Sequence, residues 1–226
     1  MKIKTKTFVG DNEEKIIKDF HKFISTRKNV ILSGFNSQSF DDKIMLSRFI
    51  KYRLGKAELF GRYDTIDTRL LLGGTTDKGT LQDYLSLFNM EGKYNGYNGA
   101  SVQKLWEEGK WKEIEKYVGQ DSIIEHRLLL ETAKFIKIKH NLSNIITYDI
   151  EVVAPKESLP NKVDLFAQKE AEIRKKYKQA STINKHVSEI NIEKEYEKNC
   201  KEIIFNKFKN KVVAIGCSWL EDEEEF

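Results

Sequence analysis

The chain has 226 residues, which is long enough to bury a core as one large domain or two small ones. Lys and Arg number 39 against 35 Asp and Glu, and a net charge of +4 is too small to indicate a nucleic-acid partner by itself. No apolar run approaches membrane-spanning length, so we expect no membrane partner.

Cysteine and proline usage bear on the compartment and the domain organisation. Cys200 and Cys217 form neither a disulfide framework nor a CxxC metal pair. Cys217 lies in an apolar strand-like run, where it is most simply a buried small hydrophobe. With two prolines and no low-complexity tract, the sequence contains no obvious flexible linker. We therefore expect a cytoplasmic protein with residues 1–226 in a single domain.

The first third of the chain alternates strand and helix patterns. Residues 2–9 alternate between polar and apolar side chains and predict a half-exposed strand. Asp11 is the expected N-cap of the following helix, with Glu14 completing a capping box. Residues 29–35 predict a buried strand, and a helix that opens at Phe40 and Asp41 is expected to run to Gly55. This alternation favours an α/β layer architecture.

The middle of the chain is less regular. Residues 65–68 predict a short strand or turn, in which Asp67 either supports the functional site or caps the next turn. A short helix is expected over residues 80–88. Residues 91–99 contain three glycines and two tyrosines. This loop is either an ordinary surface turn or, through Lys93 and its tyrosines, a loop that touches a nucleic-acid strand.

A long helix is expected from Lys110 to about Ile138, and one of its acids faces inward. Its apolar seam places Ile114, Val118 and Leu128 together with Asp121 and Glu125, at alternating spacings of four and three. Tyr117 precedes Asp121 by four residues, so the two side chains are neighbours on one face. An acid that faces the core usually has a partner or a metal.

Residues 145–153 predict a strand whose apolar run is interrupted by two carboxylates. Side chains alternate across a strand, so Asp149 and Glu151 project from the same face, about 7 Å apart. Two such acids on a buried strand repel each other and lose hydration, and a divalent cation removes both penalties. The alternative is an edge strand whose polar face points at water.

The last third is dominated by charged helical sequence. Residues 156–209 predict two helices, and a solvated helical insertion is favoured over a dedicated binding arm. Residues 211–219 predict a buried strand, followed by an acidic segment that is typical of a hairpin tip. The histidines make no zinc-like spacing, and surface or helix-face positions are expected for them.

Four features call for one explanation: the Asp149 and Glu151 strand, the loop from Asn36 to Phe40 and Asp41, the inward Asp121, and Tyr117. Phosphodiester hydrolysis by two metal ions needs several carboxylates around a pair of cations about 3.5–4 Å apart. A tyrosine hydroxyl near the attacking water can orient it.

At these residues the sequence resembles the DEDD (DnaQ-like) superfamily of 3′–5′ exonucleases, which are ribonuclease-H-like in fold. Asp149-Ile150-Glu151 resembles the first motif, residues 36–41 the second, and Tyr117 with Asp121 the third. The tyrosine subclass fits better than the histidine subclass, whose histidine would stand at Lys116. The closest resemblance is to predicted 3′–5′ exonucleases related to the proofreading domain of family B DNA polymerases. Further segments that carry it are residues 66–68, 92–102, 108–110, 114–117 and 211–217.

The order of the motifs differs from that of the resembled superfamily, because this chain runs second, third, first. We therefore expect a circularly permuted α/β domain, with a mixed five-stranded sheet flanked by helices and a charged helical insertion. In this scheme the second and third motifs lie in residues 1–139 and the first-motif strand in residues 140–155. The insertion is residues 156–209, and a core strand with a cut hairpin is residues 210–226. The alternative is that residues 1–139 and 140–226 are separate modules.

The resemblance implies a metal-dependent exonuclease that hydrolyses single-stranded DNA from its 3′ end by a two-metal mechanism, with Mg²⁺ or Mn²⁺ as cofactor. It implies that Asp149 holds both ions, Glu151 and Asp121 the nucleophile-side ion, and Asp41 the second ion. Tyr117 would position the water.

Substrate contacts and partners also follow from the resemblance. Asn36, Phe40 and Lys93 are the expected substrate-binding residues, and the Phe40 ring offers a stacking surface. A DNA polymerase is a possible partner in replication and proofreading. The alternatives are an RNase that trims short RNA oligomers and a non-catalytic nucleic-acid-binding module.

Overall fold

The computed structural model describes residues 2–60, 65–76, 78–92, 99–159, 161–206 and 209–221. The chain divides into two compact units. The first, called the sheet unit below, comprises Met1–Val152 and Val212–Phe226, and the second, the helical unit, comprises Val153–Lys211.

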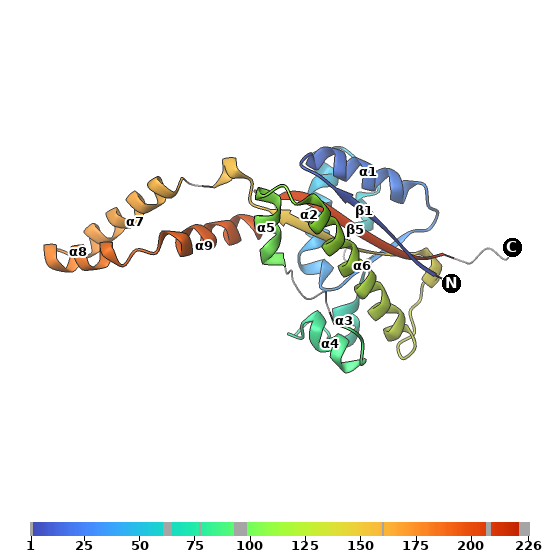
Figure 1. The fold of residues 1–226 in the computed structure, drawn as a ribbon. Coiled ribbons are helices and arrows are strands. Elements are labelled where there is room, and N and C mark those ends of the chain that lie inside the picture. The colour runs from blue at the N-terminus through green and yellow to red at the C-terminus, as the bar shows by residue number, and fades with distance from the viewer. Residues whose placement is uncertain are drawn as a thin grey trace. The chain divides into compact units, whose positions relative to one another are not determined.

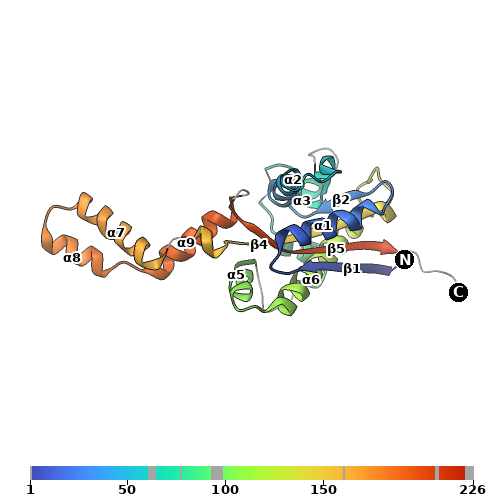
Figure 2. The ribbon, with the colours of Figure 1, turned by 90° about the horizontal axis from the view of Figure 1, so that it is seen from above.

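A five-stranded mixed sheet is the centre of the sheet unit (Figure 1). In spatial order its strands are β1 (Lys2–Val9), β5 (Lys211–Glu221), β4 (Ile145–Val153), β2 (Ile31–Gly34) and β3 (Thr65–Asp67). β1 and β5 lie side by side and antiparallel, whereas β2 is parallel to both β3 and β4 (Figure 2). The expected mixed five-stranded α/β fold is confirmed.

Strand position in the sheet follows the polarity of the sequence. β4 is central, and eight of its nine residues are buried, with Asp149 the exception. This removes the edge-strand alternative for residues 145–153. β1 lies at an edge, and its polar residues are largely exposed. The alternation of polar and apolar residues in β1 is typical of such a half-exposed strand.

The described helices of the sheet unit are α1 (Glu13–Ser25), α2 (Asp41–Lys51), α3 (Thr68–Gly73), α4 (Leu81–Leu87), α5 (Gly99–Glu107) and α6 (Trp111–Ala133). An aromatic core joins α1 and α2 to one face of the sheet. The ring centroid of Phe20 lies 6.0 Å from that of Tyr148 and 6.3 Å from that of Phe49. Thr147 contacts α6 through His126. Because successive side chains on a strand point to opposite faces, α6 covers the other face.

Several predicted boundaries are wrong in detail. Asn12, and not Asp11, is the N-cap of α1, and its side chain accepts a hydrogen bond from the backbone N–H of Lys15. Asp11 instead accepts one from the Trp106 indole (3.2 Å). α2 ends at Lys51, short of Gly55, because Arg53 adopts the left-handed conformation (φ 55°).

Two further elements differ from expectation. Residues 65–68 form β3 and then the start of α3, and the side chain of Asp67 caps this helix. α6 ends at Ala133, about a turn before the expected Ile138. None of the described helices is long and apolar enough to cross a membrane.

The helical unit contains α7 (Lys162–Lys176), α8 (Ala180–Ser188) and α9 (Ile192–Ile204). The described residues of this unit thus form three α-helices, where the sequence predicted two helices. Tyr177 is extended (φ −116°, ψ 140°) and ends α7, and the side chain of Asn191 caps α9. A small core of Ala154, Cys200 and Ile203 packs against partly buried apolar side chains.

Candidate metal centre

Three carboxylates from β4 and α6 converge on one point of the sheet unit. Asp121, Asp149 and Glu151 each offer an oxygen, and these oxygens all lie within 4.8 Å of one another. Asp121 is 1% exposed and Glu151 8%. Carboxylates this close together repel one another, and their hard oxygen donors suit a divalent cation such as Mg²⁺ or Mn²⁺. The residues present therefore fit a bound divalent metal ion.

Helix α6 brings Asp121 to the strand by crossing the sheet. Three polar contacts join it to successive strands: Glu115 to Thr7 on β1 (2.8 Å), Ser122 to Ser218 on β5 (3.0 Å), and His126 to Thr147 on β4 (2.8 Å). The helix is thus fixed at several points along its length. Asp121 lies between the first and the last of these contacts.

Gly216 on β5 permits this close approach. A Cβ built on Gly216 would stand 2.3 Å from the carbonyl oxygen of Val118 on α6 and 3.2 Å from Oγ of Ser122. A side chain of any size would therefore push α6 away from the sheet. Gly216 belongs to the strand that the sequence predicted, but the closeness of α6 was not predicted.

Tyr117 lies one helical turn before Asp121 and is 3% exposed. Its hydroxyl is hydrogen-bonded to the Asp121 carboxylate. Burial, followed by the negative charges of Glu151, Asp121 and Asp149, raises the pKa of Tyr117 far above its usual value. The hydroxyl is therefore a hydrogen-bond donor and not a base.

Asp41 is a fourth acid near the three. It opens α2 and is 9% exposed. Burial raises the pKa of Asp41 well above its usual value, and the charges of Asp149, Asp42 and Asp67 raise it further. The structure thus brings Asp41 within electrostatic range of Asp149 but leaves it outside the group of three.

Asp42 is a buried acid that the sequence analysis did not single out. Its carboxylate accepts hydrogen bonds from the hydroxyls of Tyr148 and of Thr65 (2.7 Å to Thr65). These contacts tie the start of α2 to β4 and β3, which positions the neighbouring Asp41. The only local signal was a pair of adjacent acids at a predicted helix start.

Asp67 organises the loop that carries the remaining second-motif residues. Its carboxylate accepts backbone N–H groups of Asn36 (2.9 Å) and Gln38 (3.2 Å), and it also caps α3. Asp67 therefore caps the following helix, one of the two roles considered for it, and also holds the backbone of residues 36–38. Asn36 is left-handed (φ 60°), and its side-chain oxygen accepts a hydrogen bond from Arg69 (2.7 Å). Phe40 is half-buried at the start of α2.

Lys93 and most of the predicted 91–99 loop lie outside the described residues. The structure therefore neither places Lys93 at the site nor removes it from the site.

Glu125 and His126, two consecutive residues of α6, form hydrogen bonds with segments next to the acid cluster. The Glu125 carboxylate accepts the backbone N–H of Phe35 (3.2 Å), just before Asn36. His126 is fully buried, and burial lowers its pKa to about 4, so it is neutral at neutral pH. Thr147, which contacts His126, shares a second hydrogen bond with Ser33 on β2 (2.6 Å). His126 is a helix-face residue as expected, but its burial was not predicted.

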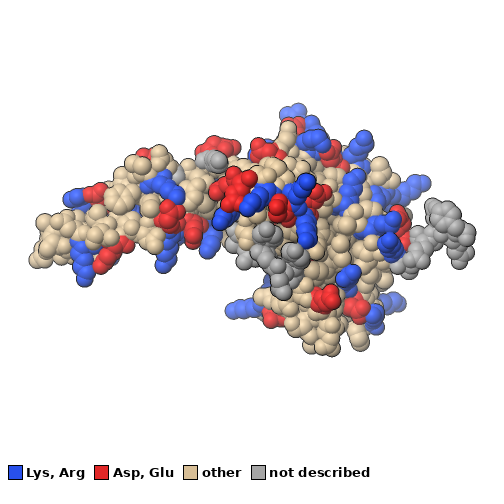
Figure 3. All heavy atoms as spheres, in the orientation of Figure 1, with Lys and Arg blue, Asp and Glu red and all other residues tan. Residues whose placement is uncertain are grey.

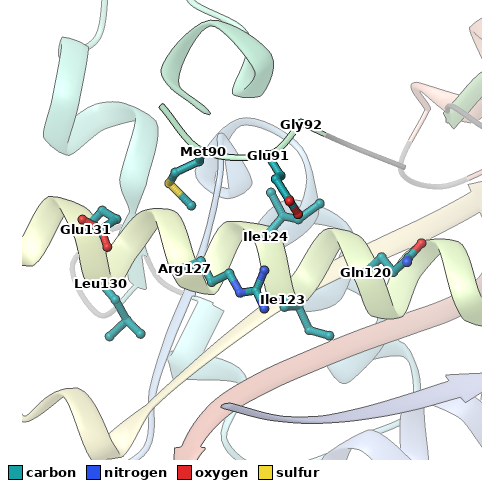
Figure 4. Close-up of a pocket in the computed structure, with 9 residues that line it drawn as sticks. All are labelled: Met90, Glu91, Gly92, Gln120, Ile123, Ile124, Arg127, Leu130 and Glu131. Atoms are coloured by element: carbon teal, nitrogen blue, oxygen red, sulfur yellow. The ribbon is translucent and has the colours of Figure 1, made fainter. Parts of the chain in front are cut away.

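A hollow of about 670 Å³ lies alongside α6 (Figure 4). Ile123, Ile124 and Arg127 from the helix and Met90 from the segment opposite are among the residues that line it. None of the four acids lines this hollow, so the hollow and the acid cluster are separate features of the fold.

A mixed sheet of this strand order, with carboxylates on its central strand and on a helix that crosses it, is consistent with the ribonuclease-H-like class of exonuclease folds. Within that class, the chain belongs to the family of predicted 3′–5′ exonucleases related to the exonuclease domain of PolB. The family model matches residues 1–162. This range contains all four acids and Tyr117, and it confirms the expected family resemblance. Comparisons with curated proteins and with solved structures found no match.

Proposed function

We propose that this protein is a divalent-metal-dependent exonuclease that hydrolyses single-stranded DNA from the 3′ end. The observation that carries the proposal is the convergence of Asp121, Asp149 and Glu151 within 4.8 Å, in a chain of the predicted 3′–5′ exonuclease family. The charge of Asp149 acting on Asp41 supports a fourth acid in the same site. Several carboxylates around a pair of cations are what two-metal phosphodiester hydrolysis requires.

Each side chain has a role in this proposal. Asp149 would hold both ions, Glu151 and Asp121 would hold the nucleophile-side ion, and Asp41 would hold the second. When bound, the two ions supply an activated water and stabilise the leaving oxygen. Tyr117 would orient the attacking water through its hydroxyl oxygen, while the hydroxyl proton is donated to Asp121, which agrees with its raised pKa.

The substrate path is proposed to run past the second-motif loop. Asn36 and Phe40 contact the terminal nucleotides, and Lys93 contacts the strand backbone. The hydrogen bonds from this loop to Asp67 and Glu125 support a fixed position for it. A fixed loop lowers the entropy cost of orienting a substrate.

We also propose that the chain is a circular permutant of the superfamily arrangement. The antiparallel pairing of β1 with β5, from Lys2 opposite Glu221 to Val9 opposite Ala214, supports a hairpin between these strands in the unpermuted order. The helical unit is then an insertion between β4 and β5, within one exonuclease domain. The family's relation to PolB supports a proofreading role beside a DNA polymerase in the cytoplasm.

The experiment is a digestion assay with single-stranded DNA labelled at either end, in Mg²⁺ or Mn²⁺ and in EDTA. We expect stepwise shortening from the 3′ end, lost in EDTA and in Asp149→Asn. The control is Asp164→Asn, which makes the same change on an exposed helix of the other unit. Full metal-dependent digestion by Asp149→Asn would contradict the assignment of Asp149 to the metal site.

A parallel assay with RNA oligomers of the same sequence separates the DNA exonuclease from the alternative RNase, since the sugar 2′-hydroxyl is the main local difference. Binding of the labelled strand without any hydrolysis, in either metal, would instead support the non-catalytic module.

A further inference from the structure

The positive charge of this protein resides in its helical unit. Residues 153–211 contain 14 Lys and Arg against 9 Asp and Glu, a net charge of +5. The rest of the chain contains 25 Lys and Arg against 26 Asp and Glu, a net charge of −1. A nuclease that acts on a polyanion with a negatively charged catalytic unit gains from a cationic surface elsewhere.

Within the helical unit one stretch contains no acid at all. Residues 173–188 contain Arg174, Lys175, Lys176, Lys178 and Lys185 and no Asp or Glu. They form the end of α7, the connection and α8, which lie together at one end of this unit (Figure 1). On the face of the unit that Figure 3 shows, Lys and Arg are interspersed with Asp and Glu. Along the sequence, the positive charge is concentrated in residues 173–188.

The four lysines of this stretch differ from other lysines of the unit in their ion pairing. Among the described residues, Lys175, Lys176, Lys178 and Lys185 form no ion pair, whereas Arg174 is paired with Glu170. Lys162 and Lys169 of the same unit are also paired with glutamates. The unpaired lysines are exposed, so their ammonium groups are available to an anionic ligand.

An aromatic pair lies inside the same stretch. The rings of Tyr177 and His186 are stacked, with centroids 4.5 Å apart and planes 21° apart. Lys176 lies over the Tyr177 ring at 5.3 Å. Both rings line a groove of about 530 Å³. Its charged lining residues are Lys169, Lys176 and Lys194 together with Glu172, Glu189 and Glu195, so the positive charge next to the rings comes from the lysines of residues 173–188 outside the groove. Glu189, 3.3 Å from the His186 ring nitrogen, lies just beyond the acid-free stretch.

We propose that residues 173–188 form a binding surface for single-stranded nucleic acid, separate from the acid cluster. Free lysines that track a phosphate backbone, next to stacked rings that accept bases, are the two components of sequence-independent single-strand binding. The identity of the ligand rests on the proposed nuclease function. The surface would retain a long strand while its 3′ end is shortened, so it matters for long substrates and not for dinucleotides.

The test measures binding of a fluorescent single-stranded DNA oligomer by anisotropy, in EDTA, across a series of salt concentrations. The first variant, called the arm variant below, replaces Lys175, Lys176, Lys178 and Lys185 by Gln. The matched control replaces four lysines of the sheet unit, Lys22, Lys28, Lys137 and Lys139, which also form no ion pair among the described residues. Both variants lower the net charge of the protein equally. A difference in their affinity for the oligomer therefore depends on where the replaced lysines lie.

We expect the arm variant to bind the oligomer at least several-fold more weakly than the control variant. Its log–log salt slope should fall by about 0.7 for each lost phosphate contact. Tyr177→Ala should weaken binding with little change in that slope, because a stacking contact releases no counterions. Equal affinities and slopes for the arm and control variants would overturn the proposal. So would binding of polyglutamate in preference to DNA, which would indicate an acidic protein partner.

A second assay separates this inference from the proposed function. Hydrolysis of a dinucleotide should be unchanged in the arm variant, while KM for a long strand rises. If the protein hydrolyses neither substrate, the proposed function fails, but the metal-free binding result still decides whether residues 173–188 bind nucleic acid.

Discussion

Gly216 on β5 lies directly against the carbonyl oxygen of Val118 on α6, at a spacing that leaves no room for a Cβ atom. This contact determines how closely the helix approaches the sheet. Tyr117 and Asp121 flank Val118 on α6, so the same contact determines how deeply they reach toward Asp149 and Glu151. The candidate metal centre therefore depends on a residue that carries no functional group.

Gly216→Ala should destabilise the fold and loosen the acid cluster. The new methyl group would stand 2.3 Å from a backbone oxygen that cannot rotate away, and overpacking of this kind costs about 1–3 kcal/mol. Urea unfolding should show the loss. Gly55→Ala is the control, because a Cβ at Gly55 meets nothing within 4 Å. Equal stability of the two variants would show that α6 can move away without cost.

Asp149→Asn should change stability in opposite directions with and without metal. In EDTA the variant should be more stable than the wild type by about 1 kcal/mol, because one of several mutually repelling charges is gone. With Mg²⁺ or Mn²⁺ the order should reverse, since a cation that binds only the folded state stabilises it. Thermal unfolding at matched ionic strength measures both. A wild-type melting temperature that is indifferent to divalent cations would contradict the metal centre.

Tyr117→Phe should lower kcat by about 10- to 100-fold at unchanged KM, because it removes the hydroxyl that orients the water and that is hydrogen-bonded to Asp121. The pH–rate profile gives a second readout. Because the pKa of Tyr117 is raised far above its usual value, no basic limb from this tyrosine should appear near pH 10. A basic limb that is present in the wild type and absent in the variant would make Tyr117 a base and not a donor.

Glu13 should make the fold sensitive to acid. It is 8% exposed and accepts hydrogen bonds from Tyr52, Arg48, Lys51 and the Val212 backbone. Burial alone would raise its pKa, but these hydrogen bonds prevail and lower it from 4.5 to about 2. A carboxyl group with a lowered folded-state pKa stabilises the fold above the unfolded pKa and loses that contribution as pH falls through the folded one.

The expected loss at Glu13 is about 3 kcal/mol between pH 4.5 and about 2. Urea unfolding across this range should show a smaller pH dependence in Glu13→Gln than in the wild type. Glu14→Gln, next to it on the exposed face of α1, is the control and should retain the wild-type dependence. If Glu14→Gln loses as much pH dependence as Glu13→Gln, the pH dependence of stability arises from surface charge in general and not from Glu13.

The functional residues that were predictable are those whose positions follow from local periodicity. The two-residue period of a strand places Asp149 and Glu151 on one face, and the helical period places Asp121 inward with Tyr117 one turn before it. Asp42 and His126 were missed, because the polar partners that bury them, Tyr148 and Thr147, lie far away in the chain. The N-cap of α1 was misplaced by one residue, since Asp11 is engaged by Trp106.

The sequence by itself determined the alternation of strands and helices and the faces on which the acids lie. Backbone periodicity and composition are sufficient for these features. Only the tertiary structure decided which acids meet, how closely α6 lies against β5 at Gly216, and which acids position the others. These depend on contacts between distant segments, whose geometry is set by packing and mutual burial and leaves no local signal in the sequence.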